Sequence, residues 1–238
     1  MNGSGSAALA DVIARRLEEA RERIAVACAA AGRKADDVGI LAVTKGFGPE
    51  AIEAALQVGL SDIGENYLQE AQAKFAAAAW PSRPVRRHYI GHVQRNKARR
   101  IGALFDVVQT VADLEAAAQL ERGAQENGKV LEVMLQVNVA GDARAGIAPS
   151  ECAAFARSLA KHAGLRVRGV MAVGPADTAA SSAAFGRAAE ALRAVHAVDA
   201  GADVLSIGMT GDLEAAIAAG STMVRLGTAL FGARPAKG

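Results

Sequence analysis

The chain has 238 residues, of which 51% are hydrophobic and 4% aromatic, and its formal net charge is +2. The length suits a single α/β barrel, and the near-neutral charge argues against a dedicated nucleic-acid-binding protein. No apolar run is long enough to predict a membrane span, and the polar start does not resemble a signal peptide. Cys28 and Cys152 show no metal-binding spacing, which indicates buried thiols in a reducing compartment. We therefore expect a cytoplasmic protein without a membrane partner.

The N-terminal part of the chain divides into two segments. Residues 1–6 are polar and rich in glycine and serine, so we expect them to be flexible. From residue 7 to residue 31, apolar residues recur at helical spacing with charged residues between them, and Gly32 follows. This pattern predicts one long amphipathic helix that packs against the rest of the molecule.

Short apolar runs then alternate with helical segments to the end of the chain. The predicted strands are residues 40–44, 60–63, 88–91, 105–109, 130–139, 167–173, 204–207 and 222–226. Strands that alternate with helices indicate a parallel sheet with right-handed crossovers. Eight such units predict a single (β/α)8 TIM barrel domain over residues 7–238, with the N-terminal helix as an addition. An open doubly wound α/β sheet is the alternative, because the strand at 60–63 is short enough to be miscounted.

Lys45 follows the first predicted strand directly, and glycines and a proline come after it. Barrel proteins carry their functional groups on the loops at the C-terminal ends of the strands, so this lysine is a candidate functional group. The ordinary alternative is an exposed lysine at the end of a strand. Other candidates lie within or just after later strands. They are Asn66, His88, Met171, Ser206, Gly208, Met209, Thr210, Arg225, Gly227 and Thr228.

The loops after the seventh and eighth predicted strands combine hydroxyl groups with glycines before a helix. This composition is typical of a phosphate-binding loop, although ordinary helix capping also accounts for it. A lysine amine that faces such loops suggests an imine, either of a sugar phosphate in an aldolase or of pyridoxal 5′-phosphate (PLP). The aldolase requires an acid or base beside the lysine, for which Glu65 is a weak candidate. Arg225 favours PLP, because an arginine can donate a hydrogen bond to the pyridine nitrogen without protonating it.

Seven ordered blocks of sequence carry a specific resemblance. They are residues 42–45 (AVTK), 64–70 (GENYLQE), 88–97 (HYIGHVQRNK), 137–139 (VNV), 169–172 (GVMA), 206–210 (SIGMT) and 224–228 (VRLGT). In this order they resemble the pyridoxal phosphate homeostasis protein family (YggS type). The resemblance implies a fold type III PLP-binding barrel, similar to the barrel domain of alanine racemase. It also implies PLP as the cofactor, held as an imine by Lys45.

The remaining roles also come from the resemblance. Arg225 would face the pyridine nitrogen, and Asn66, His88 and Met171 would line the ring pocket. The phosphate would be held by Ser206, Thr210, Gly227 and Thr228, together with backbone amides of the loop that contains Gly208 and Met209. The implied function is PLP homeostasis and delivery to PLP-dependent apoenzymes, without catalytic turnover and with no catalytic residue.

A PLP-dependent, racemase-like enzyme is the alternative. Fold type III racemases use a second proton-transfer group from a β-rich domain, and we expect no such domain because the sequence ends at Gly238. We also expect a monomer. No metal site is predicted, since the pair His88 and His92 has a glycine between its members and lacks a third ligand. The loop at 141–146 departs from the family pattern, with Arg144 near the place where the family often has a lysine, so a cofactor relay through a second lysine is in doubt.

Overall fold

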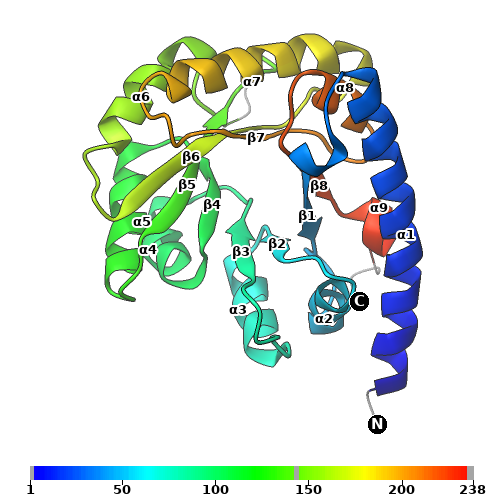
Figure 1. Ribbon diagram of the computed structural model, residues 1–238. Helices are drawn as coiled ribbons and strands as arrows, with labels where there is room; N and C mark the ends of the chain where they lie inside the picture. Colours follow the sequence, from blue (N-terminus) through cyan, green and yellow to red (C-terminus); the bar gives the residue numbers. More distant parts are fainter. Residues whose placement is uncertain (1–2, 142–144, 235–238) are drawn as a thin grey trace.

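The computed structural model describes residues 3–141 and 145–234 and shows a ring of parallel strands surrounded by helices (Figure 1). The eight strands follow one another around the barrel in chain order. They are β1 (Gly39–Val43), β2 (Asp62–Glu65), β3 (Arg86–Tyr89), β4 (Val107–Val111), β5 (Leu131–Val137), β6 (Leu165–Ala172), β7 (Val204–Ser206) and β8 (Met223–Leu226). The barrel closes where β1 pairs with β8 and Leu41 lies opposite Arg225. This closure confirms the predicted barrel over the open sheet.

Helices cover the outside of the barrel. They are α1 (Gly3–Ala30), α2 (Pro49–Gln57), α3 (Leu68–Ala77), α4 (Arg95–Leu104), α5 (Leu114–Gln125), α6 (Cys152–Leu159), α7 (Ser181–His196), α8 (Leu213–Ala218) and α9 (Thr228–Phe231). Within the described ranges, none of the helices has both the length and the apolarity of a membrane span.

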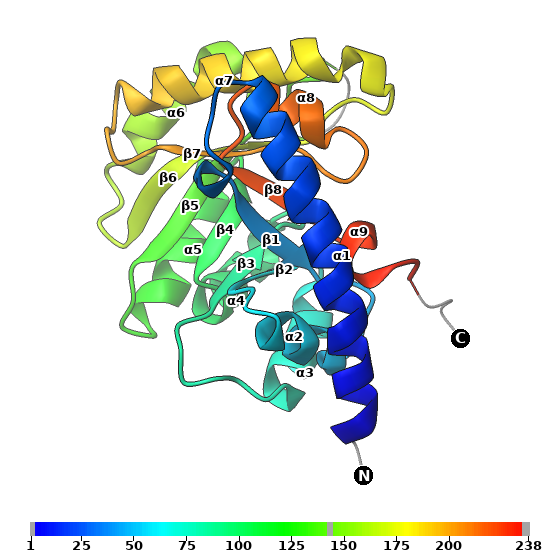
Figure 2. The ribbon, with the colours of Figure 1, turned by 45° about the vertical axis from the view of Figure 1, so that its right-hand side comes forward.

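The N-terminal helix α1 runs along the outside of the barrel next to α2, α8 and α9 (Figure 2). Ile13, Leu17 and Ile24 recur at helical spacing and are almost fully buried against these neighbours. The helix begins at Gly3, which is earlier than the sequence pattern suggested. Once packing holds a helix in place, each residue added at its end gains one hydrogen bond, so the helix can continue into glycine and serine.

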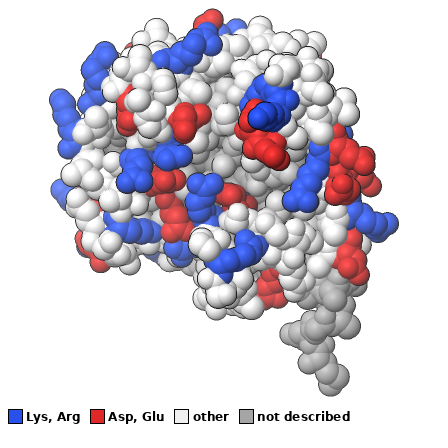
Figure 3. Space-filling view, in the orientation of Figure 1, with Lys and Arg blue, Asp and Glu red and all other residues white. Residues whose placement is uncertain are grey.

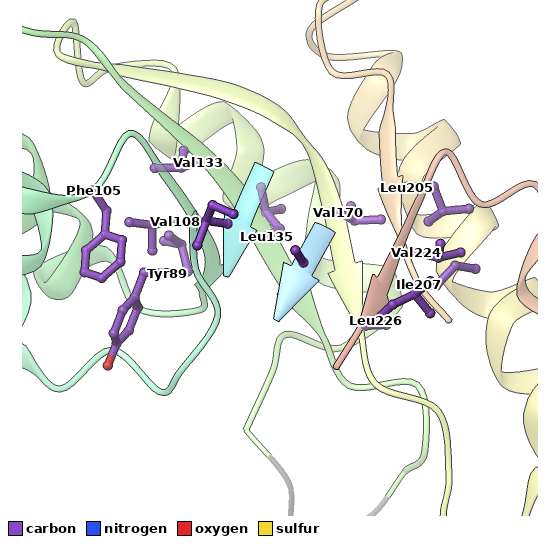
Figure 4. Close-up of a cluster of buried hydrophobic side chains, with 14 of the residues drawn as sticks. Tyr89, Phe105, Val108, Val133, Leu135, Val170, Leu205, Ile207, Val224 and Leu226 are labelled. Carbon is purple, nitrogen blue, oxygen red and sulfur yellow. The ribbon is translucent and has the colours of Figure 1, made fainter. Parts of the chain in front are cut away.

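The main hydrophobic core lies between the barrel and its helices (Figure 4). Outward-facing strand residues such as Val108, Leu135 and Val170 are fully buried there. Tyr89 and Phe105 extend this core, with their ring centroids 5.1 Å apart. The inside of the barrel is different, because buried polar side chains lie there among two smaller apolar clusters.

Strand β3 lies two residues earlier than predicted. It spans Arg86–Tyr89, whereas the apolar pattern indicated residues 88–91. Two arginines open the strand, and each has a carboxylate partner: Arg86 Nη2 lies 2.7 Å from Asp62 and Arg87 Nη2 lies 2.7 Å from Asp106. Ion pairing at the N-terminal end of the barrel therefore places charged residues in a strand that hydropathy alone does not identify.

On the face shown in Figure 3, basic and acidic side chains alternate without a large region of one sign.

Candidate functional site

A cavity of about 310 Å³ opens at the C-terminal ends of the strands. Its volume lies at the lower end of the ~300–1,000 Å³ typical of small-ligand sites. Eight of the predicted site residues line it: Lys45, Asn66, Met171, Met209, Thr210, Arg225, Gly227 and Thr228. The remaining lining residues are Val43, Phe47, Ile90, Val173, Gly232 and Arg234. The strand ends thus bring together residues from both halves of the sequence.

Lys45 is the only amine on the described wall of this cavity, and its side chain is half-buried. Burial lowers the pKa of Lys45 below its ordinary value, and the positive charges of Arg234 and Arg225 lower it further. The carboxylates of Glu65 and Glu70 oppose this effect. A lowered pKa increases the neutral fraction of the amine, which is the form that attacks a carbonyl carbon.

A buried ion cluster holds the backbone on both sides of Lys45. Lys74 Nζ donates to the Thr44 carbonyl at 2.7 Å and lies 2.6 Å from both Glu65 Oε1 and Glu70 Oε1. Glu65 Oε1 also accepts a hydrogen bond from the Thr44 hydroxyl at 2.6 Å, and Glu70 accepts one from the Gly46 amide at 2.6 Å. The cluster therefore orients the turn from which Lys45 projects.

Arg225 lies on β8 and is 5% exposed. Its Nη1 donates to the Ser206 carbonyl at 2.6 Å and the Ser206 hydroxyl at 3.0 Å, and its Nη2 donates to the Ala172 carbonyl at 2.8 Å. Burial lowers the pKa of Arg225 to about 10, against the opposing charge of Asp212. It remains a cation and a donor at neutral pH.

The loops after β7 and β8 bring Thr210, Gly227 and Thr228 to the cavity wall. Gly208 makes the turn after β7 and has a φ of +93°. A Cβ on Gly208 would lie 2.5 Å from the Cβ of Ala216, so the turn needs glycine although Gly208 is not on the wall. The loop is held by Asp212, whose carboxylate accepts from the Met209 amide at 2.6 Å.

Two predicted residues have their side chains elsewhere. His88 is fully buried inside the barrel and borders a second cavity of about 280 Å³, which Asp62 and Arg86 from the N-terminal strand ends also line. Because β3 starts two residues earlier than predicted, His88 lies closer to the N-terminal end of the barrel. Ile90 lines the cavity at the C-terminal ends of the strands, here called the upper cavity, instead. The Ser206 hydroxyl donates to Gln109 at 2.8 Å inside the barrel, and Ser206 is not on the upper cavity wall.

The structure adds residues that the sequence pattern did not identify. Arg234 lines the cavity from beyond α9, and Phe47 packs against Phe231 with ring centroids 5.4 Å apart. Lys74 is also part of the site's support, through its bonds to Thr44 and Glu65. The charged pattern Glu70–Lys74 at helical spacing was a signal for an ion pair, although not for its burial. Arg144 lies outside the described residues.

The cavity suits a ligand with polar groups. Asn66 Oδ1 is buried without a hydrogen-bond partner among the described residues, and Asn66 lines the cavity wall. A buried polar atom without a partner is costly, so a ligand group that bonds to it would be favoured. Together with one amine and two guanidinium groups, this set of residues fits an anionic aldehyde. A larger hollow of about 720 Å³ lies outside the barrel between α1 and α8, but its described walls contain no lysine, and its Arg23 is paired with Glu214 at 2.8 Å.

Comparisons with known proteins agree with this geometry. The family model "Alanine racemase, N-terminal domain" matches residues 13–235. The pyridoxal phosphate homeostasis protein of Pseudomonas aeruginosa is 44% identical over 225 residues, which cover 93% of this chain and 96% of that protein. The protein of the same name from Escherichia coli K12 is 35% identical, with 93% and 97% covered.

Solved structures give the same result. The PLP-bound structure of PipY from Synechococcus elongatus matches with a TM-score of 0.80 and 31% identity, over 92% of this chain and all of that one. Alanine racemase from Bacillus anthracis shares the fold, with a TM-score of 0.70, 19% identity and 57% of its length covered. The chain therefore belongs to the alanine racemase N-terminal domain family and, within it, to the pyridoxal phosphate homeostasis proteins.

Proposed function

We propose that this protein binds PLP through Lys45 and acts in PLP homeostasis by holding and delivering the cofactor. The observation that carries this proposal is that a lysine with a lowered pKa shares a small cavity with buried Arg225. The family membership and the PLP-bound PipY structure support the choice of PLP over another aldehyde.

The covalent step requires only the lysine and the aldehyde. Lys45 would hold the cofactor by adding its neutral amine to the aldehyde carbon, so that a carbon–nitrogen double bond would replace the carbon–oxygen double bond and the aldehyde oxygen would leave as water. Water reverses the step, so the cofactor can be released. PLP supplies an electron sink when bound, and this sink is weaker where the ring nitrogen receives a hydrogen bond without a proton. Arg225 would provide such a bond, which favours holding over turnover.

The other cavity residues would bind the two ends of the cofactor. Thr210, Gly227 and Thr228 would hold the phosphate, whereas the amides of Leu230 and Phe231 in α9 already donate to the Gly227 carbonyl. Arg234 would add positive charge at the same mouth. Asn66 and Met171 would contact the ring. Ser206 and Gly208 would support the site from behind it.

The absence of turnover is supported by the composition of the cavity wall. Among its described residues there is no carboxyl, imidazole, phenol or thiol group. Racemisation requires two proton-transfer groups that reach the same carbon, and Lys45 is the only such group among the described residues of the wall. An aldolase that uses Glu65 is also disfavoured, because Glu65 is fully buried and bonded to Lys74 and Thr44.

The visible absorption spectrum tests this proposal. Protein mixed with PLP should absorb near ~420 nm, and Lys45→Ala should abolish both this band and borohydride trapping. The exposed residue Lys161 provides the matched control, because Lys161→Ala should leave the band unchanged. A band that survives in Lys45→Ala would reject Lys45 as the imine former. Amino-acid racemase turnover that disappears in the same variant would favour the enzyme instead.

We further propose that the protein delivers PLP to apoenzymes in the cytoplasm as a monomer. The two buried free cysteines support a reducing compartment. Delivery is measured as the recovery of activity of a PLP-dependent apoenzyme mixed with loaded protein. Recovery of activity no faster than with an equal amount of free PLP would contradict delivery. The molar mass from light scattering would test whether the protein is a monomer.

A further inference from the structure

Five side chains form a continuous hydrogen-bonded chain through the inside of the barrel. Arg225 Nη1 lies 3.0 Å from Ser206 Oγ, which lies 2.8 Å from Gln109 Oε1. Gln109 Nε2 lies 3.0 Å from His88 Nδ1, and His88 Nε2 lies 2.7 Å from Asp62 Oδ1. His88, Gln109 and Ser206 are each 0% exposed. The chain connects the wall of the upper cavity to the N-terminal end of the barrel.

The chemistry of the two ends sets the direction of every bond. A guanidinium can only donate, so Ser206 Oγ accepts from Arg225 and its own hydrogen is directed to Gln109 Oε1. At the other end, burial by itself raises the pKa of Asp62. The hydrogen bond from His88 and the charge of Arg86 outweigh burial, so the pKa of Asp62 lies below its ordinary value. Asp62 is therefore an ionised acceptor, and His88 Nε2 carries the hydrogen.

The orientation of the Gln109 amide follows independently. Its Nε2 lies between His88 Nδ1 and Met223 Sδ, the latter at 3.3 Å. A thioether sulfur accepts and cannot donate, so the NH₂ group belongs on this side and the amide oxygen on the Ser206 side. All the donors consequently point from Arg225 towards Asp62.

This chain matters because Arg225 is a buried cation that has no direct carboxylate partner among the described residues. The Arg225 guanidinium donates to two backbone carbonyls and to the Ser206 hydroxyl. Hydrogen bonds that are aligned head to tail polarise one another, and the effect is stronger in a low-dielectric interior. The acceptor Asp62 thus aligns the hydrogen bonds from Arg225 to the N-terminal end of the barrel, while the charge that raises the Arg225 pKa is that of Asp212.

We propose that Gln109, Ser206 and His88 are positioning residues for Arg225, which they hold in the orientation that donates to the ring nitrogen of PLP, with Asp62 as the acceptor at the far end of the chain. This inference rests on the proposed function, since that function assigns Arg225 to the ring nitrogen.

The first test uses the cofactor-free protein. The chain contains 4 histidines, so each imidazole can be assigned by ¹⁵N NMR. We expect His88 to be the neutral tautomer with hydrogen on Nε2. Gln109→Glu replaces the amide donor by an acceptor of nearly the same shape, so a hydrogen should appear on His88 Nδ1. Gln136→Glu is the matched control in β5, where the Gln136 amide bonds to the Ala145 carbonyl, and it should leave His88 unchanged.

The second test measures the dissociation constant of PLP. Ser206→Ala removes the hydroxyl that accepts from Arg225 and leaves only a small cavity. We expect about tenfold weaker binding of PLP, as for one lost hydrogen bond to a charged group. Gln109→Leu should give a similar loss, whereas Gln136→Leu should stay within about twofold. A thermal unfolding midpoint for each variant separates loss of binding from loss of folding.

The inference fails if wild-type His88 carries its hydrogen on Nδ1 or if Gln109→Glu leaves the tautomer unchanged. It also fails if Ser206→Ala binds PLP as tightly as the wild type. Failure of the proposed function looks different: the wild type would show no absorption near ~420 nm, whatever the state of His88.

Discussion

The buried cluster around Lys74 allows a quantitative prediction for Lys74→Met. The side chain of Lys74 is 5% exposed and that of Glu65 is fully buried, with their charged atoms 2.6 Å apart. The variant keeps the apolar stem but leaves the Glu65 carboxylate buried without its cation. Breaking a buried pair in this way costs about 3–5 kcal/mol of unfolding free energy.

The assay is urea unfolding followed by the fluorescence of the single tryptophan, Trp80. With a slope near ~3 kcal/mol per molar urea, the midpoint should fall by about 1–1.7 M. Lys161→Met, at an exposed lysine, is the control and should change stability by no more than about 0.5 kcal/mol. A loss below about 1 kcal/mol in Lys74→Met would refute the claim that this pair is a buried, stabilising contact.

The pH dependence of stability and a double variant test whether the unpaired Glu65 carboxylate causes the loss of stability. Burial raises the pKa of Glu65, although the bonds from Lys74 and Thr44 oppose it. Without Lys74 the folded-state pKa rises further above the unfolded value, so the folded state binds the proton more readily. The loss of unfolding free energy in Lys74→Met, relative to the wild type, should therefore be smaller at acid pH and grow as the pH rises. Adding Glu65→Gln removes the unpaired charge and should recover part of the stability, and no recovery would contradict this account.

Three further predictions concern the cavity. Arg225→Gln should weaken PLP binding roughly ten- to a hundredfold, as for the loss of hydrogen bonds from a charged group, and unchanged affinity in a fluorescence titration would argue against its placement at the ring nitrogen. Arg234→Gln removes a positive charge that lowers the Lys45 pKa, so the pH midpoint of the imine-formation rate should move upwards, and a downward shift would contradict this electrostatic effect. Gly208→Ala forces a side chain onto a positive φ and against Ala216, and we expect a loss of about 1–3 kcal/mol in thermal unfolding; wild-type stability would show that the loop can relax.

Much of the fold was predictable because it depends on local patterns. Apolar runs of strand length alternate with amphipathic segments, and this alternation indicates parallel strands whatever their neighbours are. The position of Lys45 at the end of β1 follows from the same pattern, since parallel strands present their C-terminal ends on one side. Strand β3 was misplaced because two arginines begin it, and local hydropathy does not reveal that Asp62 and Asp106 neutralise them.

The sequence by itself determined the barrel, the face that carries the chemistry, and the lysine and arginine of the candidate site. Only the tertiary structure decided which side chains support them. Ser206 and Gln109 bond to each other across 97 positions of the chain, and Lys74 reaches Thr44 across 30. The first contact depends on the stagger between strands and on the alternation of side chains along them, so a shift of one residue would turn Ser206 or Gln109 to the opposite face. A local pattern specifies neither quantity, because closure of the whole ring sets both.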